Sequence, residues 1–208
     1  MTPACRISYP APPLDERMAL RFAGCREENE EMLALLRDAY REAEARLTYT
    51  VALREMPLEI LGDECRFGGR VIRSASLARH LSGCERVVLF AATLGLDFDR
   101  LLARESRLSP ARALILQGLG AERIESLCDC FCRELEERMA GEGFSCRTRF
   151  SPGYGDLPLS AQEPIFSLLS CEKLIGLTLT GSGLMSPTKS VSAIVGLARM
   201  DEVYYEVC

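Results

Sequence analysis

The chain has 208 residues, of which 48% are hydrophobic and 26% are charged, and its formal net charge is −5. This composition is typical of a globular protein with a sizeable core. The negative charge and the lack of a dense Lys/Arg run argue against nucleic-acid binding. No apolar run reaches the roughly 18–20 residues of a membrane span, and the start MTPACRISYPAPPLDER lacks a secretory pattern. We therefore expect a cytoplasmic protein without nucleic-acid or membrane partners.

The first third of the chain alternates between helical and extended patterns. Residues Leu14–Gly24 predict a short helix that ends at a glycine, and Arg26–Leu47 predicts a longer amphipathic helix. The apolar stripe of the longer helix recurs every three or four positions, at Met32, Leu36, Tyr40, Ala43 and Leu47. Between Thr48 and Ile72 the helical period is lost, and short strands with turns are expected. Ser74–Leu81 begins with a serine suited to capping and predicts a short helix.

The middle of the chain holds its strongest signals. Arg86–Leu94, RVVLFAATL, is a nearly continuous apolar run and predicts a buried strand. A helix through Phe98–Glu105 follows. Ser109-Pro110 then opens the longest predicted helix, which Gly141 ends. Its expected core face consists of Ile124, Leu127, Phe131, Leu135 and Met139.

The last third returns to strands. We expect them around CRTRF (146–150), LTLTG (177–181), SVSAIVGLARM (190–200) and VYYEV (203–207), with a helix through Ala161–Leu169. No repeat or low-complexity linker interrupts the chain. The sequence therefore predicts one α+β domain over residues 1–208, with helices packed on a twisted antiparallel or mixed sheet.

Ten cysteines are the unusual feature of the composition. No CxxC pair occurs, and the densest group is Cys128, Cys130 and Cys132 within the predicted long helix. There Cys128 and Cys132 share one face and Cys130 points the other way. A zinc or iron–sulfur site needs convergent ligands, so we favour reduced, mostly buried thiols over a metal site.

Two charged residues are candidates for ligand binding. Glu125 lies in a helical strip of small residues, where a carboxylate can hold an ammonium group or simply face solvent. Arg149 stands at a predicted strand end before Ser151-Pro152-Gly153-Tyr154-Gly155. Its guanidinium can bind a carboxylate or phosphate through two hydrogen bonds, and the rigid, glycine-containing loop can turn its backbone toward a ligand. The alternative is a plain connecting turn with a solvated arginine.

The remaining polar residues do not form a catalytic motif. Lys189 beside Ser190 would suit an anion, but no Walker spacing surrounds it. His80 is the only histidine and has no obvious partner for a nucleophilic triad. Tyr204 and Tyr205 would point to opposite faces of a strand, and one of them is free to cover a ligand ring. An arginine, a glutamate and tyrosines fit a zwitterionic, amino-acid-like ligand that carries an aromatic base.

The motifs RFSPGYGD, LTLTGSGLMSPTKSVSAIVG and VYYEV, with RVVLFAATLG and GAERIESLCD, carry a family resemblance. Together they resemble the activation (reactivation) domain of cobalamin-dependent methionine synthase, in its free-standing version. The resemblance covers residues 74–208, so residues 1–73 would be an N-terminal helical and strand extension. The aspartate that fused family members place against the ligand has no counterpart in residues 1–60.

The resemblance implies a function. Domains of this family bind S-adenosylmethionine and dock over the corrinoid when its cobalt has been oxidised. A reductant, typically flavodoxin, then reduces the cobalt, which takes the methyl group. The chain would be a component of methyltransferase activity, with cobalamin supplied by methionine synthase or another corrinoid protein.

The same resemblance assigns the site. Arg149 would hold the methionyl carboxylate, and the loop around Ser151 and Tyr154 would contact the ligand through its backbone. Glu125, or Asp129 if the helix alignment shifts, would lie near the ligand, as would Tyr204 and Tyr205. No catalytic residue or metal ligand is implied. A non-catalytic regulatory protein that binds S-adenosylmethionine or docks on a corrinoid protein is the alternative.

Overall fold

The computed structural model describes residues 3–25 and 29–200. Its centre is an antiparallel sheet in which the strands lie in the order β1 (Cys5–Ser8), β2 (Thr50–Pro57), β6 (Cys84–Thr93), β10 (Ser190–Arg199) and β7 (Phe144–Cys146). The two long central strands, β6 and β10, match the predicted apolar runs and are almost entirely buried. Residues 1–73 thus supply two strands to the same sheet as residues 74–208.

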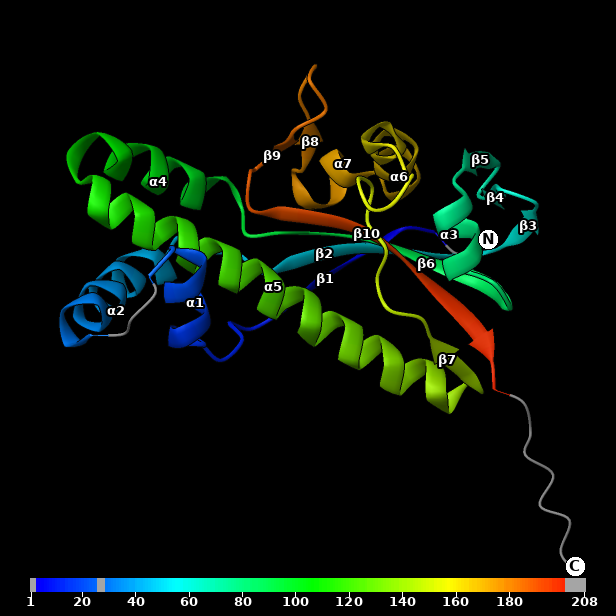
Figure 1. The fold of residues 1–208 in the computed structure, drawn as a ribbon, viewed down its shortest axis with the longest axis horizontal. Helices are drawn as coiled ribbons and strands as arrows, with labels where there is room; N and C mark the ends of the chain where they lie inside the picture. Colours follow the sequence, from blue (N-terminus) through cyan, green and yellow to red (C-terminus); the bar gives the residue numbers. More distant parts are fainter. Residues whose placement is uncertain (1–2, 26–28, 201–208) are drawn as a thin grey trace, which may run out of the picture.

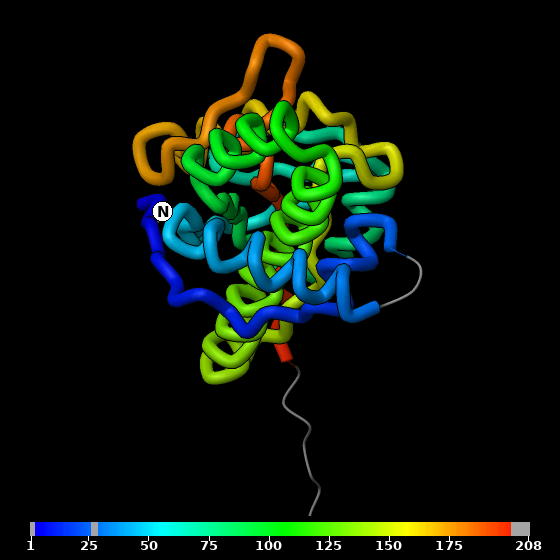
Figure 2. Tube along the Cα trace, turned by 90° about the vertical axis from the view of Figure 1, so that its left-hand side faces the viewer, coloured from blue at the N-terminus to red at the C-terminus, as the bar shows by residue number. Residues whose placement is uncertain are grey.

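Helices cover one face of this sheet (Figure 1). They are α1 (Glu16–Phe22), α2 (Glu30–Glu44), α4 (Leu96–Leu108) and α5 (Pro110–Gly141). Ser109 caps α5 by accepting a hydrogen bond from the backbone N–H of Arg112, with Pro110 in the first turn, as the sequence predicts. All five residues of the predicted core face of α5 are buried against the sheet. Figure 2 shows α2 running across the far longer α5.

The opposite face carries shorter elements around a second apolar cluster. These are α3 (Ala75–His80), α6 (Gln162–Leu169) and α7 (Cys171–Ile175), a 3-10 turn at Leu159–Ala161, and a small sheet of β3 (Glu59–Leu61), β4 (Glu64–Phe67) and β5 (Arg70–Arg73). A hairpin of β8 (Thr178–Leu179) and β9 (Met185–Ser186) projects beside them (Figures 1 and 2). The central sheet therefore lies between two layers, which confirms the predicted α+β class.

A buried ion pair fastens the N-terminal segment to α5. Arg123 and Glu122 are adjacent on the helix and almost completely buried. Arg123 donates to the carbonyl oxygens of Pro12 (2.6 Å) and Pro13 (2.7 Å) and to both oxygens of Glu122 (2.5 Å each). Glu122 also accepts from the backbone N–H of Asp15 at 3.1 Å. Since the guanidinium and carboxylate are satisfied, the core tolerates both charges.

Three short elements were not predicted, and one prediction was displaced. The strands β1 and β9 and the helix α7 are only a few residues long, so they show no periodic signal. The strand expected around CRTRF is wrong in position, because β7 ends at Cys146 and only Phe150 pairs again, in a single bridge to Ile194. The strand expected at VYYEV lies outside the described residues. Within the part of the chain described here, no helix is long and apolar enough to cross a membrane.

Candidate functional site

A small cavity lies beside β10, at the point where the chain leaves β7 and turns toward α6. Its volume is about 190 Å³. Its walls come from α5, from the loop after Phe150, from β9 and from the start of β10. The lining residues are Glu125, Arg149, Ser151, Pro152, Tyr154, Met185, Ser190, Val191 and Ser192. Four of the six residues predicted from the sequence, namely Glu125, Arg149, Ser151 and Tyr154, therefore meet at one cavity.

The two predicted charges contact each other. The Nη2 of Arg149 donates a hydrogen bond to Oε2 of Glu125. The two side chains thus form an ion pair between the segment after β7 and helix α5. Burial by itself lowers the pKa of Arg149, but the hydrogen bond and the charge of Glu125 more than offset it, so the pKa is raised and the guanidinium stays charged. The Arg149 side chain is 27% exposed and that of Glu125 is 42% exposed. The pair is thus reachable from solvent.

The alternative carboxylate, Asp129, lies one turn further along α5. Its Oδ1 is 3.5 Å from the same Nη2 of Arg149, and its side chain is 64% exposed. It lines a neighbouring cavity of about 260 Å³, which Arg149 also lines. Glu125 is therefore the primary partner of Arg149, and Asp129 is a peripheral one.

The loop that follows Arg149 is held by its own hydrogen bonds and by a cap on α3. The backbone N–H of Tyr154 donates to Ser151 and that of Gly153 to Leu157. Gly153 has φ 96° and Gly155 has φ 55°, values that favour glycine, as the sequence indicates. The Tyr154 ring is exposed and stands edge-on to Phe150.

Asp156 ties this loop to the start of α3. Its carboxylate accepts from the Ser74 hydroxyl (2.5 Å) and from the backbone N–H groups of Ala75 (2.8 Å) and Ser76 (3.0 Å). These hydrogen bonds, that of Ser74 first, hold the pKa of Asp156 far below its ordinary value. These hydrogen bonds hold the loop beside the cavity against the start of α3.

Two residues that the sequence singled out, Lys189 and Cys128, do not line this cavity. Lys189 is directed away from the cavity and donates to the carbonyl oxygen of Gln117 at 3.1 Å, and burial lowers its pKa. Cys128 is buried in the core, where burial raises its pKa. Among residues 3–25 and 29–200, no group of three Cys, His, Asp or Glu side chains is placed to hold a metal ion. Tyr204 and Tyr205 lie outside the described residues.

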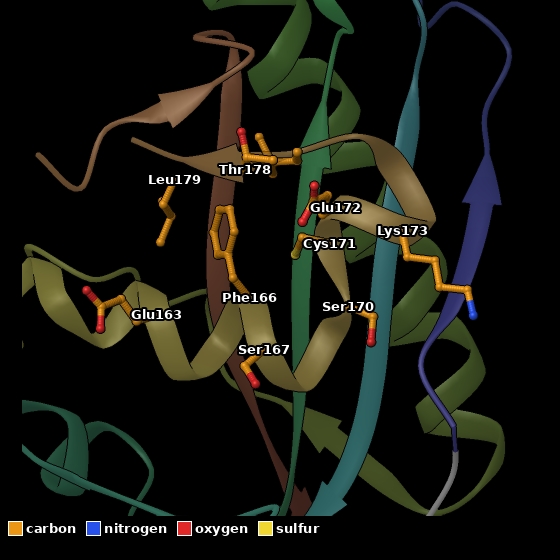
Figure 3. Close-up of a pocket in the computed structure, with 10 residues that line it drawn as sticks. Glu163, Phe166, Ser167, Ser170, Cys171, Glu172, Lys173, Thr178 and Leu179 are labelled. Carbon is orange, nitrogen blue, oxygen red and sulfur yellow. The ribbon is translucent and has the colours of Figure 1, made fainter. Parts of the chain in front are cut away.

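A larger cavity, of about 710 Å³, opens between α6, α7 and β8 (Figure 3). Glu163 and Glu172 lie on two sides of Phe166, and Lys173 is turned away from it (Figure 3). None of the predicted site residues lines this cavity. Its exposed carboxylates offer no match for the carboxylate of a zwitterion, so the smaller cavity is the better candidate.

Sequence reasoning missed Met185, Val191 and Ser192. Ser192 is 2% exposed, and its hydroxyl has no hydrogen-bond partner in the described part of the chain. Buried hydroxyls are normally paired. Ser192 belongs to the motif LTLTGSGLMSPTKSVSAIVG, but nothing in the sequence separates a wall residue of a cavity from an ordinary strand serine.

The C-terminal part of the chain matches a known family model. Residues 134–208 match the model of the vitamin B12 dependent methionine synthase activation domain. The chain resembles this activation domain. The match contains Arg149, the loop and β10, as well as the tyrosines outside the described residues, whereas Glu125 precedes it. A search among curated proteins found no match.

The fold agrees with this resemblance over nearly the whole chain. A solved structure, described as the crystal structure of the MetH reactivation domain bound to AdoHcy, has a TM-score of 0.69 to this chain. The similarity covers 97% of this chain and 80% of that one, at 18% sequence identity. The activation-domain fold predicted from the sequence is thus confirmed.

Proposed function

We propose that this chain binds S-adenosylmethionine at the cavity beside β10 and presents it to the corrinoid of a partner protein for reductive methylation. The partner is cobalamin-dependent methionine synthase or another corrinoid protein, with flavodoxin or a similar reductant as electron donor. The observation that carries the proposal is the Arg149–Glu125 pair at a solvent-reachable cavity. The activation-domain resemblance supports it.

The pair is complementary to the ends of an amino acid. A ligand carboxylate can take the guanidinium of Arg149 while the ligand ammonium takes the carboxylate of Glu125, so that one ion pair is exchanged for two. Because no charge is left unpaired, the exchange avoids the penalty of a desolvated lone ion. A ligand with only one of the two charges would leave Arg149 or Glu125 without a partner. The site therefore favours the intact zwitterion.

The size of the cavity limits which part of the ligand it encloses. At about 190 Å³ it lies below the roughly 300–1,000 Å³ of common small-molecule pockets. It suits the amino-acid end, and the adenosyl part must extend along the rim past Tyr154 and β10. A partly open rim is what delivery to a second protein requires.

The chemistry asks little of this chain beyond binding and orientation. The sulfonium is already an activated methyl donor, and the corrinoid, once reduced, supplies the nucleophilic cobalt. Arg149 and Glu125 fix one end of the donor, and the preorganised loop fixes its direction. Neither histidine nor cysteine is among the described residues that line the cavity, so they form no Ser–His or Cys–His nucleophile pair there.

Transfer of the labelled methyl group from S-adenosylmethionine to a cobalt(II) corrinoid protein, with a chemical reductant, tests the proposal. We expect methylation with the wild-type chain and with Arg147→Ala, whose guanidinium donates to the carbonyl oxygen of Ser82 at 3.2 Å and does not line the cavity beside β10. Arg149→Ala should abolish it. Binding of S-adenosylmethionine without methyl transfer to any corrinoid protein would instead support the regulatory alternative.

A further inference from the structure

Among the described residues, no strand pairs with one edge of β10 at its start, and this edge borders the cavity. On its other edge, β10 pairs with β6 from Ser190 to Ala198. Beyond Phe150, by contrast, no described segment continues the ladder on the cavity side. The backbone of β10 at Ser190–Ser192 therefore borders the cavity.

The direction of the free backbone groups follows from the neighbouring hydrogen bonds. Ile194 exchanges two hydrogen bonds with Phe150, each 2.9 Å long. In an extended strand the N–H and C=O of a residue point to the same edge, and alternate residues share that edge. Ser192 and Ser190 therefore aim their N–H and C=O toward the cavity side.

The opposite edge gives the same result. Lys189 O accepts from the backbone N–H of Leu94 on the β6 side at 3.0 Å. Hence Lys189, Val191 and Ala193 face β6, and the residues between them face away. The hydrogen bonds on the two edges of β10 thus agree that Ser190 and Ser192 direct their backbone groups toward the cavity.

The loop cannot satisfy these groups. In a continued ladder Pro152 would stand opposite Ser192, but proline has no N–H to donate. The loop's amides at Gly153 and Tyr154 bond to Leu157 and Ser151 instead. Within the described chain the Ser192 N–H donates no backbone hydrogen bond outside the ladder with β6 and its C=O accepts none, and its hydroxyl has no partner either. Backbone groups away from water are nearly always paired, so a polar ligand group is the natural partner.

The side-chain directions show where a ligand must pass. Val191, Ala193 and Val195 face the α5 side, with Arg149 and Glu125, whereas Ile194 belongs to the cluster on the α6 side. By alternation Ser192 points with Ile194. Met185, which also packs on the α6 side, lines the cavity too. The cavity therefore wraps around the edge of β10, from the ion pair on one face to Met185 on the other.

We infer that the free edge of β10 at Ser192 hydrogen-bonds the adenosyl part of the ligand. This inference rests on the proposed function. With its amino-acid end at Arg149 and Glu125, an adenosyl ligand would lie between the loop at Ser151–Tyr154 and the wall formed by Met185 and Ser190–Ser192, so it would run along this edge. One residue pair along a strand is about 7 Å, the scale of the step from an amino-acid head to a ribose. Ser192 thus serves as a positioning and specificity residue through its main chain and its hydroxyl.

Residue-resolved amide hydrogen exchange, with and without S-adenosylmethionine, tests this inference. We expect the Ser192 amide to exchange at least about tenfold more slowly with the ligand, whereas Val191 and Ala193, already bonded to β6, serve as internal controls and change little. Methionine alone should not protect Ser192, because it lacks the adenosyl group. If S-adenosylmethionine binds and leaves the Ser192 amide unchanged, the inference is wrong and the proposed function stands. If it does not bind, both fail.

A variant supplies the second readout. Ser192→Ala should weaken S-adenosylmethionine binding by about 3- to 10-fold without lowering the Tm of the free protein, because the hydroxyl has no partner there. Ser145→Ala removes an exposed hydroxyl on β7 that donates to the carbonyl oxygen of Ala198 at 3.3 Å, far from the cavity, and should leave the affinity unchanged. A lower Tm with unchanged affinity would show that Ser192 has only a structural role and would overturn its assignment to the ligand.

Discussion

The exchange of the Arg149–Glu125 ion pair for contacts with a zwitterion makes a prediction about Glu125→Gln. The substitution keeps the shape of the side chain and removes its charge. In the free protein the pair is partly exposed, and such pairs contribute about 0–1 kcal/mol to the free energy of unfolding. For a chain of this size that corresponds to a Tm decrease of about 2–4 °C at most. Stability should therefore hardly change.

The affinity for S-adenosylmethionine should change more. A hydrogen bond between charged groups contributes about 1.5–3 kcal/mol, and the neutral amide of the variant can no longer form one with the ligand ammonium. Part of this loss in binding free energy, up to about 1 kcal/mol, is offset in the variant. Binding no longer breaks an ion pair between Arg149 and a charged residue 125. The net loss of about 0.5–3 kcal/mol corresponds to binding weakened roughly 2- to 150-fold.

Calorimetric titration and thermal unfolding of the same preparations measure both quantities. Asp129→Asn is the matched control, since Asp129 contacts the same guanidinium at 3.5 Å from a more exposed position. We expect it to alter affinity less than threefold. If Asp129→Asn weakens binding and Glu125→Gln does not, the two carboxylates have the opposite roles. A Tm loss well above 4 °C in Glu125→Gln would refute the reasoning, because the pair would then be part of the fold.

Three further predictions concern the scaffold. Arg123→Met should lower the free energy of unfolding by about 3–5 kcal/mol, because it leaves the Glu122 charge buried without its partner; denaturant unfolding should show partial recovery in a Glu122→Gln/Arg123→Met double variant, and no recovery would contradict the ion-pair explanation. Gly118→Val should cost about 2–3 kcal/mol, since a Cβ there would collide with the carbonyl oxygen of Ala19; Gly141→Ala, with nothing within 4 Å, is the control, and equal effects would refute close helix packing as the cause. Asp156→Asn should lower the Tm at neutral pH; because the pKa of Asp156 is depressed in the folded state, its stabilisation is present above its ordinary value of 3.8 and is lost as the pH falls below it. A Tm difference that stays constant from pH 7 to about pH 3 would contradict the capping role.

Much of the fold was predictable because its elements are long and locally consistent. The serine caps at Ser74 and Ser109, the apolar run of β6 and the core face of α5 each carry a signal within a few turns or residues. By contrast, β1, β9 and α7 are short and are formed through contacts with distant segments. A local pattern does not contain that information.

The candidate site divides in the same way. Residue type makes Arg149 and Glu125 stand out in the sequence, and the closely spaced proline and glycines mark the loop after them. Ser192 and Met185 do not stand out, since their place depends on which edge of β10 stays open. The edge stays open because the pairing at Phe150 does not continue at Pro152. This depends on how distant segments pack, so a local sequence pattern does not contain it.

Titration of the purified chain with S-adenosylmethionine by calorimetry, beside Arg149→Ala and Arg147→Ala, tests the central claim most directly. We expect a single site in the wild type and in Arg147→Ala that is lost in Arg149→Ala, with all three proteins equally folded. Binding that survives Arg149→Ala undiminished would contradict it, because the ligand would then lie away from the cavity beside β10.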